Sequence, residues 1–185
     1  MAGPLELLKY LFSKGRSAAK AVDMSPLEGL QRLVHGPKDE VTARELIHPH
    51  TLPENGLPFD HRVIADEMMT NLGQFNKFNE GQTITFANGA GPAQGAYQLV
   101  PREKGTYIPY FASFKPGTGT PMLEDAYRAA KQMAPDQPVY LTSTPNATNF
   151  YRKQIPQGWR ESEYEGNPIF MRKACGGLVA MKGKR

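Results

Sequence analysis

The sequence predicts an α/β domain of the α+β type, with a mixed sheet. Three features of the chain support this class. Residues 96–101 and 106–114 read as strands across a tight link, as the arms of a hairpin do. A helical apolar period follows over 120–133, and a further strand pattern over 139–144. Because a strand, a crossover helix and a strand join parallel neighbours, while hairpins join antiparallel ones, the sheet should contain both.

The other elements follow from the same periods and from turn residues. Leucines at helical spacing predict an amphipathic helix over 4–21, and a capping box at Ser25 predicts a second short helix that ends at Gly36 and Pro37. We therefore divide the chain into an N-terminal helical arm at 1–36, a domain at 40–174 and a basic tail at 175–185. Within the domain we also expect a strand at 41–48, a helix through 62–75 capped by Asp60, a strand at 83–86, a helix at 148–154 and a closing hairpin at 159–173.

Composition restricts the classes of protein to which the chain can belong. With 185 residues, 39% of them hydrophobic, it can bury the core of a soluble domain. No apolar run approaches the roughly 20 residues of a membrane-spanning helix, and the N-terminus lacks the continuous apolar core of a secretion signal. The single cysteine, Cys175, excludes an intramolecular disulfide and a cysteine-rich zinc site. We expect a cytoplasmic protein in which this thiol is inert.

Positive charge gathers near the two ends of the sequence. Four basic residues against one acid give residues 1–21 a charge of +3, and five basic residues give 171–185 a charge of +5. Because the formal net charge is +4, the body between them is mildly acidic. We therefore expect no nucleic-acid surface on the domain itself. The apolar stripe of residues 1–21 instead predicts a contact with a protein partner or with a second copy.

A glycine turn between a strand and a helix is the segment most suggestive of chemistry. Gly117 and Gly119 let the backbone curl tightly before the helix at 120–133. Unpaired amides at a helix start favour an anion, and Pro121 fits the first turn because its missing donor costs nothing there. The motif predicts a phosphate or pyrophosphate cradle at 117–121. It lacks the Lys-Ser/Thr pair of a Walker loop and the third glycine of a dinucleotide fingerprint.

Two segments in order and at matching spacing resemble the Gcn5-related N-acetyltransferase (GNAT) superfamily. The first is Phe114-Lys115-Pro116-Gly117-Thr118-Gly119, followed by a helix with a Met-Leu pair, where the family has a Gly-x-Gly loop. The second is Thr144-Pro145-Asn146-Ala147-Thr148-Asn149-Phe150-Tyr151, followed by Gly158-Trp159, where the family has Asn-Pro-x-Ala-x-x-Phe-Tyr and Gly-Phe. Phe114 stands where the family has a basic or amide residue, with Lys115 beside it. The resemblance covers residues 96–173.

The resemblance implies a GNAT-like fold with an N-terminal helical extension, and acetyl-CoA as co-substrate. In this family the strands corresponding to 106–114 and 139–144 splay apart, and the pantetheine arm lies between them. Tyr151 matches the position from which the family protonates the departing thiolate, so it is the expected catalytic residue. The residues expected to bind acetyl-CoA are Phe111, Ala112, Ser113, Lys115, Gly117, Thr118, Gly119, Thr120 and Asn146. Loops 49–58 and 88–95 would border the acceptor.

No residue of the sequence is assigned as the base that deprotonates the amine. Glu103 and the alternating Glu161, Glu163 and Glu165 are interpreted as surface charges. His48, His50 and His61, with Asp60 nearby, could suggest zinc, but no cysteine or second cluster accompanies them, so we expect no metal.

Two functions remain open from the sequence. The first is an acetyl-CoA-dependent N-acyltransferase that acts on an amine of unknown identity. The alternative is a catalytically silent protein of the same fold that serves in an assembly, as the missing base and the helical arm would allow. The segment 158–170 also looks like that of small acetyltransferase-like proteins of tailed phages, so a virion location is the alternative to the cytoplasm.

Overall fold

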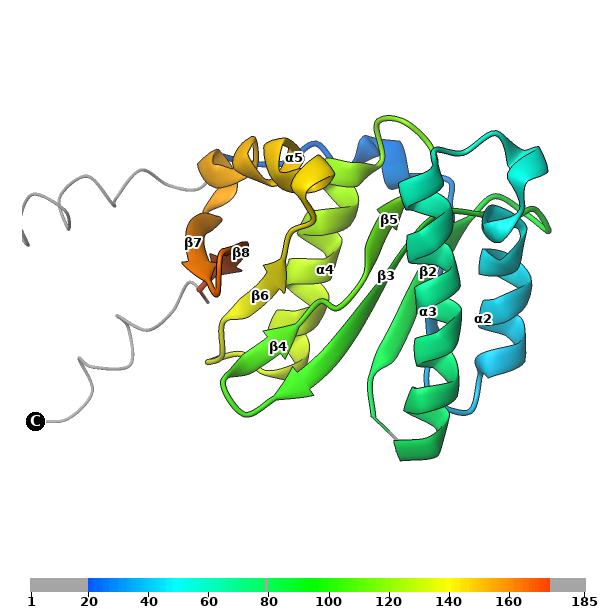
Figure 1. Ribbon diagram of the computed structural model, residues 1–185, viewed down its shortest axis with the longest axis horizontal. Helices are drawn as coiled ribbons and strands as arrows, with labels where there is room; N and C mark the ends of the chain where they lie inside the picture. Colours follow the sequence, from blue (N-terminus) through cyan, green and yellow to red (C-terminus); the bar gives the residue numbers. More distant parts are fainter. Residues whose placement is uncertain (1–19, 79, 174–185) are drawn as a thin grey trace, which may run out of the picture.

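Eight strands form one mixed sheet in the part of the chain that the computed structural model describes, residues 20–78 and 80–173 (Figure 1). The strands are β1 (Gln31–His35), β2 (Gln82–Ala87), β3 (Ala93–Arg102), β4 (Gly105–Tyr107), β5 (Phe111–Ser113), β6 (Val139–Thr142), β7 (Arg160–Tyr164) and β8 (Asn167–Arg172). Their order across the sheet is β1-β2-β3-β4-β6-β8-β7, and β5 pairs with β3. All neighbours are antiparallel except β4 and β6, which are parallel.

Helices cover the two faces of the sheet with different side chains. On one face α4 (Gly119–Met133) buries Met122 and Leu123 against Ile84, Tyr97 and Leu99. On the other, α2 (Glu40–Ile47) and α3 (Phe59–Phe78) lie side by side in front of the strands, as Figure 1 shows. Successive side chains of a strand point to opposite faces, so the second face carries a different set of strand residues, among them Thr83, Ala96, Gln98 and Ala112.

Short helices complete the described part of the chain and connect the larger elements. They are η2 (Ser25–Leu27), η3 (His48–Thr51), η4 (Pro53–Asn55), η5 (Pro145–Ala147), α5 (Thr148–Arg152) and η6 (Ile155–Gln157). Within the described ranges, no helix combines the length and apolar character needed to cross a bilayer.

The central strand–helix–strand unit is confirmed. The expected helix at 120–133 is α4, and β4, the first part of the expected strand 106–114, runs parallel to β6, with Thr106 opposite Val139 and Tyr107 opposite Tyr140. The tight hairpin between β3 and β4 and the closing hairpin of β7 and β8 are also present.

Three local predictions are wrong. The helix expected from Ser25 is one 3-10 turn, after which Gly29 takes a φ of +81° and β1 joins the sheet beside β2. The sheet therefore begins inside the segment assigned to the arm. Residues 41–48 are not a strand but belong to α2 and η3, because Ala43 and Ile47 are buried at helical spacing. Asp60 lies in the first turn of α3 and is not its cap.

The expected strand at 106–114 is also divided into β4 and β5. Pro109 lies between them and has no N–H to donate, so it interrupts the ladder. The helix expected at 4–21 and Cys175 lie outside the described residues, apart from Lys20 and Ala21. The amide of Lys20 donates to the carbonyl of Pro156 at 2.9 Å.

Candidate active site

The parallel pair at the centre of the sheet opens at one end. The amide of Ile108 still donates to the carbonyl of Tyr140 at 2.9 Å. Beyond this point β5 pairs with β3 and not with β6, while β6 continues along β8. The two strands therefore diverge, and a wedge opens between β5 and the segment that follows β6.

The edge of β5 that faces the wedge carries free backbone groups. The amide of Gln98 donates to Tyr110 and the amide of Phe114 donates to Gln94, both at 2.9 Å. Because bonding directions alternate along an antiparallel strand, the backbone groups of Phe111 and Ser113 point away from β3. No hydrogen bond between described residues uses them. An extended ligand with amide groups could pair with this edge.

The loop from β5 to α4 is held by its own side chains. The hydroxyls of Ser113 and Thr118 both donate to the carbonyl of Lys115 at 2.8 Å, and the two hydroxyls are 2.6 Å apart. Gly117 follows with a φ of +86°, a conformation that glycine adopts without strain. At the start of α4, the amides of Gly119 and Thr120 have no partner among the described residues, as is usual for a first helical turn. These donors could hold a phosphate.

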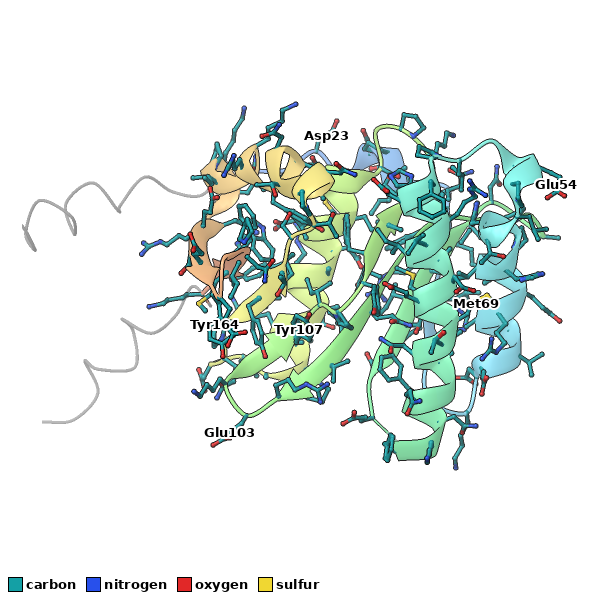
Figure 2. All side chains as sticks on the ribbon, in the orientation of Figure 1. Asp23, Glu54, Met69, Glu103, Tyr107 and Tyr164 are labelled. Carbon is teal, nitrogen blue, oxygen red and sulfur yellow. The ribbon has the colours of Figure 1, made fainter. Side chains whose placement is uncertain are left out.

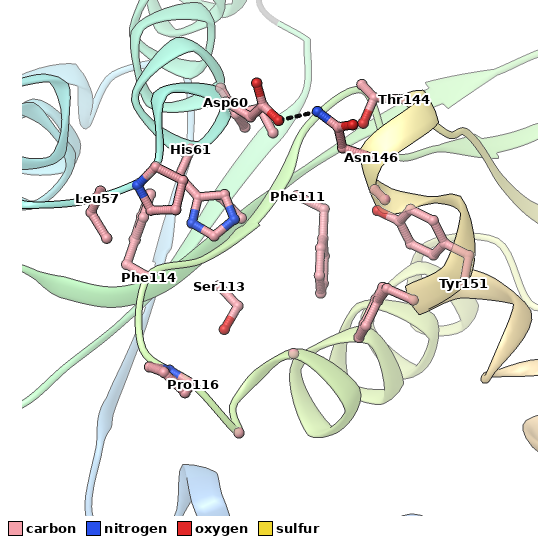
Figure 3. Close-up of a pocket in the computed structure, with 17 residues that line it drawn as sticks. Leu57, Asp60, His61, Phe111, Ser113, Phe114, Pro116, Thr144, Asn146 and Tyr151 are labelled. Atoms are coloured by element: carbon pink, nitrogen blue, oxygen red, sulfur yellow. Dashed lines mark hydrogen bonds between the residues drawn. The ribbon is translucent and has the colours of Figure 1, made fainter.

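A cavity of about 460 Å³ lies in the wedge (Figure 3). One wall is β5 with the loop that follows it, and the opposite walls come from the start of α3 and from the η5–α5 segment. Its lining is mostly apolar, and a volume of this size is typical of small-molecule sites. The residues that line it are Leu57, Pro58, Asp60, His61, Ile64, Phe111, Ala112, Ser113, Phe114, Pro116, Gly117, Gly119, Thr144, Asn146, Ala147, Phe150 and Tyr151.

Tyr151 reaches this cavity from α5. Only 6% of the residue is exposed, and its ring packs against Phe150 and Phe170 at centroid distances of 5.0 and 5.3 Å. Burial raises the pKa of its phenol above the usual value near 10, because the anion would lose its hydration. Tyr151 is therefore a neutral phenol at pH 7, and its hydroxyl can act as a proton donor in the cavity.

The residues expected to bind acetyl-CoA separate into three groups. Phe111, Ala112, Ser113, Gly117, Gly119 and Asn146 line the cavity together with Tyr151. Thr120 lines an adjoining hollow of about 370 Å³ with Lys153, Gln154 and Gln157, and Phe150 lines both this hollow and the cavity. Lys115 is exposed and Thr118 is 4% exposed, and neither is among the residues that line these two spaces.

Asp60 and His61 form part of the cavity wall opposite Tyr151 (Figure 3). The side-chain amide of Asn146 donates to Asp60 Oδ2, which links η5 to α3 across 86 residues of sequence. From the sequence, Asp60 was expected to cap the helix, and the only other role considered for Asp60 and His61 was metal binding, which was not expected. One feature of the sequence could have indicated their place in the cavity wall. They directly follow the Pro-rich loop 49–58, which was expected to border an acceptor.

The histidines considered as metal ligands occupy different environments. His50 donates through Nε2 to the carbonyl of Ala93 at 2.5 Å and stacks on Phe114 at 3.8 Å between ring centroids. His48 is exposed on η3. No group of three or more His, Cys, Asp or Glu side chains able to hold a metal ion occurs within residues 20–78 and 80–173. Glu103 lies at the β3–β4 turn, at the opposite end of the sheet from the wedge (Figure 2).

Comparison with known proteins bears on the fold. No family model and no curated protein sequence matches the chain. Among solved structures, an acyl-CoA N-acyltransferase from Pseudomonas aeruginosa matches with a TM-score of 0.55 and 17% identity, over 78% of this chain and 99% of that one. A GNAT-family acetyltransferase from Listeria monocytogenes matches with a TM-score of 0.54 and 15% identity, over 79% and 96%. Tetrahymena GCN5 matches with a TM-score of 0.52 and 8% identity, over 78% and 94%.

The described part of the chain has the fold of the Gcn5-related N-acetyltransferase superfamily. The resemblance found in the Gly-x-Gly loop and the Phe-Tyr segment is thus confirmed at the level of the fold.

Proposed function

We propose that this protein is an acetyl-CoA-dependent N-acyltransferase that transfers an acetyl group to an amine. The observation that carries the proposal is the opened wedge, in which the outward backbone groups of Phe111 and Ser113 border a cavity that also contains Tyr151. A fold alone does not define an activity, so the proposal depends on these groups and not on the structural neighbours.

The residues present fit acetyl-CoA. The amides and carbonyls of Phe111 and Ser113 suit the amide groups of a pantetheine arm, and the amides of Gly117, Gly119 and Thr120 suit a pyrophosphate. Lys153 lines the adjoining hollow and supplies a positive charge there. When bound, the thioester supplies an acyl group activated for attack by an amine. Tyr151 would give its phenol proton to the sulfur that leaves.

Binding of acetyl-CoA measured by calorimetry tests the proposal. A ligand that binds only the folded protein adds about 2.7 kcal/mol of stability at 100 times its Kd, so a rise in Tm should accompany it. We expect Gly119→Val to abolish this binding, because even a Cβ at this position would lie 3.0 Å from the Phe150 ring, beside the free amides. The matched control is Gly73→Val in α3, where the atom nearest to a Cβ would be Arg44 Nη2, at an ordinary contact distance of 3.8 Å. Equal affinity in both variants would contradict the site.

A catalytically silent protein of this fold is the second candidate. It is favoured by Phe114, which is buried on His50 at the loop position where the GNAT family carries a basic or amide side chain. Absence of any heat or Tm change with acetyl-CoA would support this candidate. The contact through residues 1–21, with a protein partner or a second copy, stays a prediction in both cases.

A further inference from the structure

The wall of the cavity opposite Tyr151 combines apolar surface with one small polar cluster. Leu57, Pro58 and Ile64 supply the apolar side chains of this wall, and Phe111 and Phe150 face them. Among the described residues that line the cavity, Asp60 provides the only carboxylate, and no lysine or arginine is present. An acceptor with its own carboxylate or phosphate would find no cationic partner here. An apolar body with one cationic end matches the lining.

His61 is placed to meet that cationic end. Its ring projects from the first turn of α3 into the cavity, on the side across from Phe111 (Figure 3). Nδ1 is buried with no hydrogen-bond partner among the described residues, and Nε2 is neither buried nor hydrogen-bonded. A half-buried imidazole without partners is unusual in a folded protein and calls for a ligand or a chemical role.

Asp60 adds a negative charge beside His61. Its Oδ2 accepts the amide of Asn146, which orients the carboxylate at the mouth of the cavity. Its Oδ1 has no hydrogen-bond partner among the described residues, so it can accept a hydrogen bond from an ammonium group. The ionisable groups that line the cavity are thus Asp60, His61 and Tyr151, with Arg62 next along α3 and the exposed Lys115 on the loop.

We infer that the acceptor is a primary amine carried on an aromatic or aliphatic group, that Asp60 binds its ammonium form and that His61 removes its proton. This inference rests on the proposed acyl transfer. Proton transfer from the ammonium to His61 Nε2 frees the lone pair of the nitrogen, which forms a bond to the thioester carbonyl carbon. The C–S bond then breaks, and the sulfur takes the Tyr151 proton. The second amine proton returns to Tyr151 through water, and the imidazolium releases its proton to solvent.

Three amines of different character test the class of acceptor. Phenethylamine carries an aromatic ring, ethanolamine has the same ammonium without it, and spermidine carries several charges. We expect calorimetry on the full chain, with and without CoA, to show phenethylamine binding at least tenfold tighter than the other two. The rate of acetyl transfer, measured by the release of the CoA thiol, should rank the three amines in the same order. Equal or tighter binding of ethanolamine or spermidine would overturn the inference.

Two variants separate a chemical role of His61 from a structural one. We expect His61→Gln to lower kcat for phenethylamine at least 100-fold and to remove the acidic limb of its pH profile, with the Kd of CoA unchanged. The control is His48→Gln, which alters an exposed histidine outside the cavity lining. Added imidazole should restore part of the activity of His61→Ala. Loss of the acidic limb in the control, or its persistence in His61→Gln, would contradict the role.

Asp60→Asn should weaken phenethylamine binding at least tenfold while CoA binding is retained. Unchanged amine binding in this variant would remove Asp60 from the site.

If CoA does not bind the wild-type chain, the proposed function is wrong, and the calorimetric ranking of the three amines still decides whether the cavity takes an apolar amine. If CoA binds and the ranking fails, only the present inference is wrong.

Discussion

The two halves of the segment from Gly105 to Ser113 belong to one run of chain but have different environments. In the first half, Thr106 and Tyr107 are paired on both sides, with β3 and with β6. In the second half, Phe111 and Ser113 direct their backbone groups into a cavity. The change occurs at Pro109, which cannot continue the ladder. The closed half thus fixes the strands, and the open half provides unpaired groups for a ligand.

Apolar packing also differs between the two halves. Ile108 and Val139 are buried in the core on the α4 face of the closed half. In the open half, side chains of Phe111, Phe150 and Tyr151 surround the space that sheet neighbours would otherwise fill. Unpaired backbone groups are costly when buried dry, so an open half with this lining is suited to a bound partner.

Gly105→Ala breaks the closed half and should have the largest effect on stability. Gly105 has a φ of +148°, and a Cβ there would lie 2.4 Å from the backbone carbonyl of Pro138. Strain and overpacking together should lower the free energy of unfolding by about 3 kcal/mol, measured by urea denaturation. Gly89→Ala is the control, because its positive φ costs about 1 kcal/mol while its Cβ meets open space. Equal losses in the two variants would show that the β4–Pro138 contact is unimportant.

Tyr151→Phe alters the open half without removing its packing. If the phenol protonates the leaving sulfur, kcat for acetyl transfer should fall roughly 100-fold or more, with little change in Tm. Tyr164→Phe removes an exposed hydroxyl from β7 and should leave kcat unchanged. Retention of full activity in Tyr151→Phe would show that the hydroxyl only packs in the core.

The pH dependence of stability should show the smallest effect, and it involves two histidines, His35 and His50. Burial lowers the pKa of His35, on β1, and of His50, which stacks on Phe114, below the usual histidine value of 6.5. The unfolded chain therefore binds protons more readily, so the free energy of unfolding should decline as the pH falls below about 6.5. Urea denaturation from pH 7.5 to 5.0 measures this decline, and substituting both histidines with glutamine should reduce it.

Elements that depend on local sequence could be predicted, and those that depend on packing could not. The unit from β4 through α4 to β6 was predicted because glycine turns and apolar periods mark its boundaries. Residues 41–48 were wrongly predicted to be a strand because Val41, Ala43 and Ile47 fit the alternation of a strand as well as the period of a helix. Contact with α3 and the Glu40–Arg44 pair at helical spacing favour the helix.

On the β5 and α5 side of the candidate site individual residues were predicted, whereas on the α3 side only loop 49–58 was expected, as a border of the acceptor. The Gly-x-Gly loop and Tyr151 lie in the two segments that resemble the GNAT family, so their neighbourhood followed from the resemblance. Asp60 and His61 join them because α3 packs on the sheet, and no local pattern in the sequence records that contact.

Amide hydrogen exchange tests the difference between the two halves most directly. Without ligand, the amides of Phe111 and Ser113 should exchange rapidly, and those of Ile108 and Ala112, which face β6 and β3, should be protected. Saturating CoA should slow exchange at Phe111 and Ser113 at least tenfold and leave Ile108 and Ala112 unchanged. Unaltered exchange at Phe111 and Ser113, under conditions where calorimetry shows CoA bound, would contradict the account.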